Sequence, residues 1–204
     1  MAVARRRKRY RMVLFTRVVA TALLGAGLGL PPAIALQHAA GATPGDLMPA
    51  LLVALIEEPA KLLGVVWLLW RPALRFRMDG VIYGAAAGMG FAAVETALYS
   101  LARINSLGAL LGVLWLRTLL SPFSHGTWTA IVCATIWSER VAGCRHGGPR
   151  ILAVLGVVVL LHALWDWRPL SLPWNFVWLL AVAGTSALAL RLVLRHANAA
   201  SGVP

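Results

Sequence analysis

Long apolar stretches constrain this chain more than any other feature of its sequence. A membrane-spanning helix needs about 20 mostly apolar residues, and five windows meet that need: 12–36, 47–70, 79–101, 150–167 and 174–194. The chain is 60% hydrophobic and only 13% charged, whereas soluble domains are about 45–50% apolar and about 25% charged. Because a helix satisfies its own backbone hydrogen bonds in lipid, these windows predict an all-α, polytopic transmembrane helical bundle.

A sixth window, 106–137, contains Ser121-Pro122 near its middle. It is either one long helix broken at Pro122 or a short re-entrant segment followed by a span. The basic residues favour the first alternative. Lys and Arg gather in the amino-terminal tail, in 71–78, in 138–150 and at the carboxyl end, and the positive-inside rule places such segments in the cytoplasm. We therefore expect about six spans in the cell membrane, with both termini cytoplasmic.

No internal repeat, low-complexity tract or linker divides the chain, so residues 1–204 are expected to form one membrane-embedded domain. It would have a basic cytoplasmic tail, 1–11, and a core, 47–167, that carries the motifs described below. The apolar run after the tail is longer than the 7–15 residues of a signal peptide, which predicts a retained first span. The net charge of +12 lies at the ends of apolar runs, so the expected partner is the lipid bilayer and not a nucleic acid.

Small residues recur at four-residue spacing in two of the predicted spans. Gly25-x-x-x-Gly29 and Gly84-x-x-x-Gly88 each place two glycines on one helix face. Such faces let two helices approach closely in a membrane. We interpret both as packing surfaces.

Several ionisable side chains fall inside the predicted spans. Four of the seven acidic residues do so, together with one lysine and two histidines: Glu57, Glu58, Glu95, Asp166, Lys61, His125 and His162. A charged residue at mid-helix costs roughly 2.5–3.5 kcal/mol on insertion scales. These side chains are therefore expected to point inward and to pair with one another, and such residues are functional candidates.

The second span carries Glu57-Glu58-Pro59-Ala60-Lys61. Lys61 is four residues from Glu57 and three from Glu58, so it can neutralise either carboxylate. The other carboxylate would then face the interior of the bundle. A purely structural ion pair is the alternative, but it would need only one acid.

Three further spans contribute one polar motif each. The third carries Glu95, and the fifth carries His162 and Asp166 at a spacing that lets the carboxylate orient the imidazole. His125 follows the break at Pro122, where a helix start can present a side chain. Each alone also fits a packing hydrogen bond, a satisfied buried histidine or an interfacial histidine. Similar predicted depth on four helices favours one shared polar pocket.

This order of motifs resembles the PrsW-type intramembrane proteases, within the larger group of CAAX-prenyl-protease-like (Abi) membrane proteins. The resemblance covers roughly residues 47–167. One difference is Thr96, where the family usually has Asn after the second-motif glutamate. The matching residues are Glu57-Glu58-Pro59-Ala60-Lys61, Phe91 through Glu95, His125, and the pair His162 and Asp166.

The resemblance implies an endopeptidase that cleaves membrane-anchored protein substrates, such as an anti-sigma-factor-like regulator. The implied catalytic set is Glu57, Glu58, Glu95, His125, His162 and Asp166, supported by Lys61 and Phe91. The base that activates water is Glu57 or, less favoured, Glu58.

The implied cofactor is none or zinc, with Glu95, His125 and His162 as candidate ligands. The sequence contains no His-Glu-x-x-His, which slightly favours a metal-free glutamate mechanism. Two other classes stay open at this point. Buried Glu, His and Asp also build the proton relays of transporters, although the repeated halves typical of transporters are not visible. The second open class is a non-catalytic membrane interaction protein.

Overall fold

The computed structural model describes residues 15–41, 46–69, 77–102, 104–143, 148–167, 169–171 and 174–199. Every regular element in these residues is a helix, which confirms the all-α class. In chain order they are a helical segment 15–24, η1 (Gly25–Gly29), α2 (Leu30–Ala40), α3 (Leu47–Leu69), α4 (Arg77–Leu101), α5 (Leu107–Leu120), η2 (Ser121–Phe123), α6 (His125–Val141), α7 (Gly148–Asp166) and α8 (Trp174–Ala199). Segment 15–24, η1 and α2 are continuous and are called the first helix below.

Within the described residues, five helices are long and apolar enough to cross a membrane: Phe15–Ala40, Met78–Leu101, Leu107–Val141, Gly148–Asp166 and Trp174–Arg195. The remaining helix, α3, has 23 residues. It carries three charged side chains, Glu57, Glu58 and Lys61, and all three are buried. The prediction of a polytopic membrane bundle is thus confirmed, with α3 as its most polar helix.

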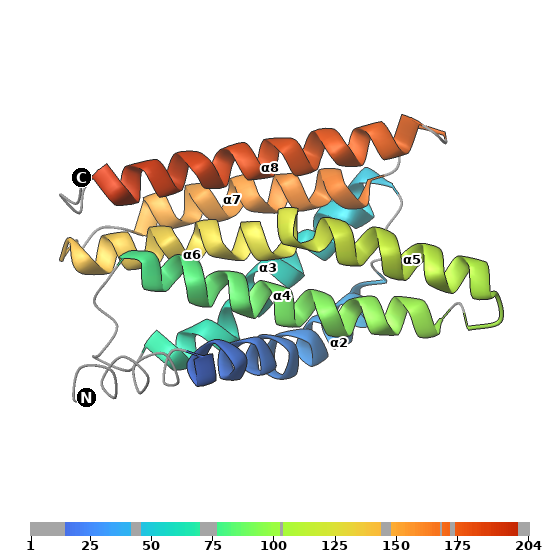
Figure 1. Ribbon diagram of the computed structural model, residues 1–204, viewed down its shortest axis with the longest axis horizontal. Coiled ribbons are helices and arrows are strands. Elements are labelled where there is room, and N and C mark those ends of the chain that lie inside the picture. The colour runs from blue at the N-terminus through green and yellow to red at the C-terminus, as the bar shows by residue number, and fades with distance from the viewer. Residues whose placement is uncertain are drawn as a thin grey trace, which may run out of the picture.

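The helices form a bundle in which α3 crosses the others obliquely (Figure 1). From top to bottom of the view, α8, α7, the α5–α6 pair, α4 and the first helix follow one another, and α3 crosses behind them. α3 contacts the first helix, α4, α6 and α7. Its neighbours therefore shield its charged residues from lipid.

The first helix changes its path at η1, a π-helical turn just before Pro31-Pro32. Proline has no backbone N–H, so it cannot continue the regular hydrogen-bond ladder. A Cβ on Gly25 would overlap the backbone of Ala87 in α4, and one on Gly29 would lie 2.9 Å from the carbonyl oxygen of Ala60 in α3. The first predicted glycine face is therefore a close packing surface. After η1, α2 packs mainly against α3.

The second glycine face presses α4 against α6. A Cβ on Gly84 would lie 2.7 Å from the carbonyl oxygen of Thr129, and one on Gly88 would overlap the carbonyl of His125. Because nothing but hydrogen fits between these backbones, the start of α6 is fixed against the middle of α4. This contact sets where His125 lies relative to the Phe91–Glu95 turn.

The sixth window folds as one broken helix. α5 and α6 lie nearly in line in Figure 1, separated by the single turn η2. Pro122 lies in that turn, and Ser124 has φ −117° and ψ −101°, outside the helical region. The structure thus has the kinked span and not the re-entrant segment, and the break makes His125 the first residue of α6.

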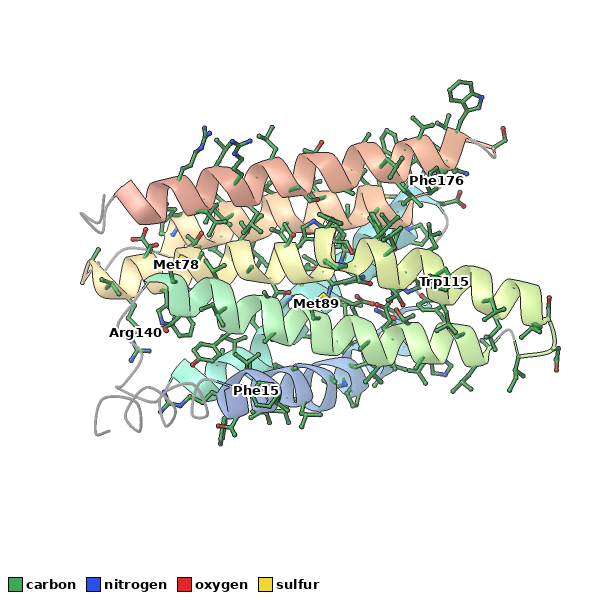
Figure 2. The ribbon with its side chains drawn as sticks, viewed as in Figure 1. Phe15, Met78, Met89, Trp115, Arg140 and Phe176 are labelled. Atoms are coloured by element: carbon green, nitrogen blue, oxygen red, sulfur yellow. The ribbon has the colours of Figure 1, made fainter. Side chains whose placement is uncertain are left out.

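Successive helices alternate in direction. Figure 2 shows Phe15, Met78 and Arg140 toward one end of the bundle and Trp115 and Phe176 toward the other. The six passes of the chain, counting α5–α6 as one, therefore bring the start of the first helix and the end of α8 to the same end of the bundle.

Candidate active site

Lys61 is the central cation of the site. It is fully buried, and its Nζ donates to Glu58 Oε1 at 2.6 Å and to His125 Nδ1 at 2.9 Å. Glu57 Oε2 lies 3.4 Å from the same nitrogen. A lysine ammonium has three protons to donate, and the two hydrogen bonds use two of them, whereas the contact with Glu57 is an ion pair without a hydrogen bond. The predicted i+3 and i+4 pairing is present, with Glu58 as the closer partner.

Glu58 links α3 to α7. Its Oε1 also lies 2.7 Å from His162 Nδ1. A carboxylate only accepts hydrogen bonds, so Nδ1 is the protonated nitrogen and the lone pair of a neutral His162 is on Nε2. That Nε2 is 3.7 Å from Glu57 Oε2 and 3.5 Å from Asp166 Oδ2. Glu58, and not Asp166 as we expected, is therefore the carboxylate in closest contact with His162.

His125 has a different arrangement. Since the ammonium of Lys61 donates to Nδ1, the proton of a neutral His125 is on Nε2, which lies 3.5 Å from Glu95 Oε2. The ring is buried and lies edge-on to His162, with centroids 5.1 Å apart. The break before α6 thus places His125 next to His162.

Glu57 has one oxygen with neither a hydrogen bond nor a close cation, whereas the unbonded oxygen of Glu95 lies 2.6 Å from Arg117 Nη2. Glu57 Oε1 accepts a hydrogen bond from Gln37 Nε2 at 2.8 Å. Its Oε2 is buried and makes no hydrogen bond within the described residues. A buried acceptor without a partner is costly, and at functional sites it marks the place of a water, an ion or a substrate group.

Glu95 pairs with an arginine from α5. Arg117 Nη2 lies 2.6 Å from Glu95 Oε2, although the angle is not that of a hydrogen bond. Arg117 Nε donates to Thr96 Oγ1 at 3.0 Å, and its guanidinium lies 4.7 Å from the ring centroid of Tyr99. Thr96, where the family usually has Asn, therefore still serves as a hydrogen-bond acceptor.

Aromatic rings seal the inner side of the site. Lys61 Nζ lies 4.8 Å from the centroid of Phe91, a cation–π distance. Trp128 stacks on His162 with centroids 4.9 Å apart, and its Nε1 donates to Ser186 Oγ at 2.9 Å. The apolar walls lower the local dielectric and so strengthen the interactions among the charged groups.

A cavity of about 250 Å³ reaches this cluster from outside. Gln37 of the first helix, Glu57 of α3, and Glu95 and Tyr99 of α4 supply its polar wall, and Leu30, Ile34 and Leu98 are among its apolar residues. Glu57 and Glu95 thus lie where a ligand in the cavity would meet them.

The site lies midway along the bundle. Met89 is beside Gly126, the residue after His125, and Figure 2 shows Met89 in the middle of the bundle.

One group of three residues has the composition of a metal site. Ligand atoms of Glu57, His125 and His162 all lie within 4.8 Å of one another, and all three residues are buried. Two imidazoles and a carboxylate suit zinc. The site also holds four carboxylates, Glu57, Glu58, Glu95 and Asp166, against two cations, Lys61 and Arg117, so a dication would balance the charge when both histidines are neutral.

The group of three contains Glu57 where the expected ligand set has Glu95. Glu95 is instead paired with Arg117. His162 is prepared to bind through Nε2, because Glu58 accepts from its Nδ1, the support that metal-binding histidines usually have. To bind a metal through Nε2, a neutral His125 would have to carry its proton on Nδ1, and Nδ1 would then no longer accept the hydrogen bond from Lys61. The residues fit a metal with that one adjustment.

The structure brings together all the residues predicted for the site. Three further residues belong to it that the sequence reasoning missed: Gln37, Arg117 and Trp128. Arg117 carried a usable signal, since it is a charged residue inside an apolar window. Gln37 lies one residue beyond the predicted first span, and Trp128 is indistinguishable from an ordinary core tryptophan in the sequence.

A membrane bundle that encloses paired carboxylates and two histidines beside a cavity has the groups that an intramembrane hydrolase needs. The chain belongs to the PrsW family of intramembrane metalloproteases, whose family model matches residues 14–194. It is also 31% identical over 154 residues to Protease PrsW of Halalkalibacterium halodurans, covering 73% of this chain and 68% of that protein. No solved structure matches the chain significantly. The resemblance inferred from the motifs is thus confirmed, and the chain is a multi-pass membrane protein with intramembrane endopeptidase function.

Proposed function

We propose that Glu57 is the residue that activates water for cleavage of single-span membrane proteins. The observation that carries this is the position of Glu57 Oε2, which is buried, lacks a hydrogen bond within the described residues and belongs to a residue on the cavity wall. Glu58 is the poorer candidate, because its Oε1 already accepts from Lys61 and His162. Glu58 then positions Lys61 and His162, and Glu57 is the catalytic base.

The reaction follows from these contacts. Glu57 accepts a proton from a water in the cavity, and the water oxygen bonds to the carbonyl carbon of the scissile peptide. The carbonyl π electrons move to its oxygen, and cationic or N–H groups at the site stabilise this oxyanion. When the C–N bond breaks, the leaving nitrogen takes the proton back from Glu57. His162 lies 3.7 Å from Glu57 and is placed to donate to the oxyanion when protonated on Nε2.

A zinc-dependent reaction is the alternative to this metal-free step. Glu57, His125 and His162 would hold the ion, and when bound it would supply Lewis acidity to water and to the carbonyl. Glu95 is the second carboxylate on the cavity wall. It is placed to hold a proton whenever Glu57 is engaged as a ligand.

The bundle sits, in this proposal, in the cell membrane with its basic connections cytoplasmic, as the positive-inside rule predicts. The substrates are membrane-anchored proteins, and the motif resemblance favours regulators of the anti-sigma-factor type. Support for a membrane-anchored substrate comes from the cavity, whose exposed residues Ile34 and Leu98 are apolar.

The test is cleavage of single-span reporters in lipid nanodiscs. The reporters carry randomised residues beside one transmembrane segment, and any that the wild type cuts is kept. Glu57→Gln retains size and can still accept from Gln37, so the fold should survive while cleavage falls by about 10² or more. Glu139→Gln is the matched control, because Glu139 pairs with Arg150 away from the site. Wild-type rates in Glu57→Gln would show that Glu57 is not the base.

A further inference from the structure

A long apolar groove runs along the outside of the first helix. It has a volume of about 720 Å³ and lies between the first helix and α4. The residues of the first helix that line it recur every three or four positions, from Leu23 through Ala26 and Gly27 to His38. At a rise of about 1.5 Å per residue this stripe is about 22 Å long, comparable to much of a membrane span.

The groove adjoins the cavity at the active site, because both are lined by Leu30, Ile34 and Leu98. The cavity then continues inward to Glu57 and Glu95. A chain lying in the groove therefore has a direct route to the carboxylates.

The path of the first helix explains the opening. Its glycines hold η1 tightly against both α3 and α4. After Pro31-Pro32, α2 follows α3 and separates from α4. The space left between α2 and α4 contains the cavity. The change of path at Pro31-Pro32 therefore opens access to the site.

The floor of the groove suits a helix better than a lipid tail. Ala26, Gly27, Pro31 and Ala35 are small or flat, and small residues are what transmembrane helices use to approach one another. The rim residues Leu23 and Val94 are 68% and 42% exposed, so the groove faces lipid.

We propose that this groove is the docking site for the transmembrane helix of the substrate, which enters the active site sideways between α2 and α4. The inference rests on the proposed protease function. In this proposal the helix stays in the groove, and an unwound segment at its end enters the cavity that leads to Glu57 and Glu95.

The experiment blocks the groove without touching the catalytic groups. Gly27 lines the groove, and a Cβ on it would meet nothing within 4 Å, so Gly27→Trp should fold. Gly184 in α8 is equally open and lies outside the groove, which makes Gly184→Trp the matched control. Two substrates are compared: a single-span reporter that the wild type cuts, and a short soluble peptide with the same cleaved residues.

Gly27→Trp should raise KM for the membrane reporter by about tenfold and change cleavage of the soluble peptide by no more than about twofold. Gly184→Trp should change neither. An equal loss on both substrates, or no loss on either, would overturn the docking site while leaving the protease assignment intact. If the wild type cuts neither substrate, it is the proposed function that fails, and the docking site fails with it.

A second measurement does not depend on turnover. A photo-crosslinker at Val94 in the Glu57→Gln background should capture the reporter, whereas one at Leu160, an exposed residue of α7, should not. Capture of lipid alone, or of a second copy of this chain alone, at Val94 in the presence of reporter would assign the groove to that occupant and overturn the proposal.

Discussion

Arg117 on α5 neutralises Glu95 on α4, with Nη2 2.6 Å from Oε2. Lys61 neutralises Glu58 at the same distance within α3. The site therefore contains two close ion pairs, and Glu57 shares Lys61 only at 3.4 Å. This division of charge leaves Glu57 as the acid on the cavity wall without a close cation of its own.

Arg117→Met should destabilise the protein, because it leaves the Glu95 carboxylate buried without its cation. Losing one partner of a buried pair costs about 3–5 kcal/mol, and both side chains here are largely buried. Arg117→Met with Glu95→Gln should recover most of the loss. The measurement is the midpoint of thermal unfolding in detergent, and a double variant no more stable than Arg117→Met would contradict the pairing.

Lys61→Met should be destabilising by about 3–5 kcal/mol for the same reason. The rescue identifies the partner. Glu58→Gln added to Lys61→Met should restore more stability than Glu57→Gln added to it, because Lys61 lies 2.6 Å from Glu58 and 3.4 Å from Glu57. Equal rescue by the two glutamine variants would mean that the lysine is shared evenly.

Much of this site could be predicted because lipid penalises charge. The cost of burying Glu57, Glu95 and His162 in separate spans required the spans to converge, and they do. Apolar windows are predictable for the same reason: the window 79–101 predicts a helix, and α4 is Arg77–Leu101.

What sequence alone could not supply is the rotation of one helix against another. Spacing within α7 placed Asp166 beside His162, but α3 packs so that Glu58 comes closer to that histidine. The same packing puts Glu57 in place of Glu95 beside the two histidines. Periodicity fixes the partners within a helix, whereas partners between helices depend on how close the backbones pack, as at Gly88 and His125.

The orientation in the membrane can be tested with reporter fusions. The basic connections 71–78 and 138–150 should be cytoplasmic, so fusions after residues 75 and 145 should report the cytoplasm. Fusions after 42, 104 and 171 should report the opposite side. A cytoplasmic signal at 171 would contradict the six-pass arrangement, in which the connection between α7 and α8 lies at the other end of the bundle from Arg140.

Metal analysis separates the two candidate ligand sets. If zinc is held by Glu57, His125 and His162, purified wild-type protein should contain about one ion per chain, and Glu57→Gln, His125→Gln and His162→Gln should each lose most of it. Glu95→Gln should keep the metal, because Arg117 and not the metal is the partner of Glu95. His38→Gln is the matched control, since His38 is an exposed histidine of α2 outside the group of three.

Activity then decides what the metal does. Removing it with a chelator should abolish cleavage of a reporter, and zinc should restore it, if the ion supplies the Lewis acid. Loss of metal in Glu95→Gln with retention in Glu57→Gln would restore the ligand set expected from the motifs. Full cleavage by metal-free protein, lost only in Glu57→Gln, would instead leave Glu57 to activate water alone, with Lys61 and His162 as the nearest groups able to stabilise the charge that develops.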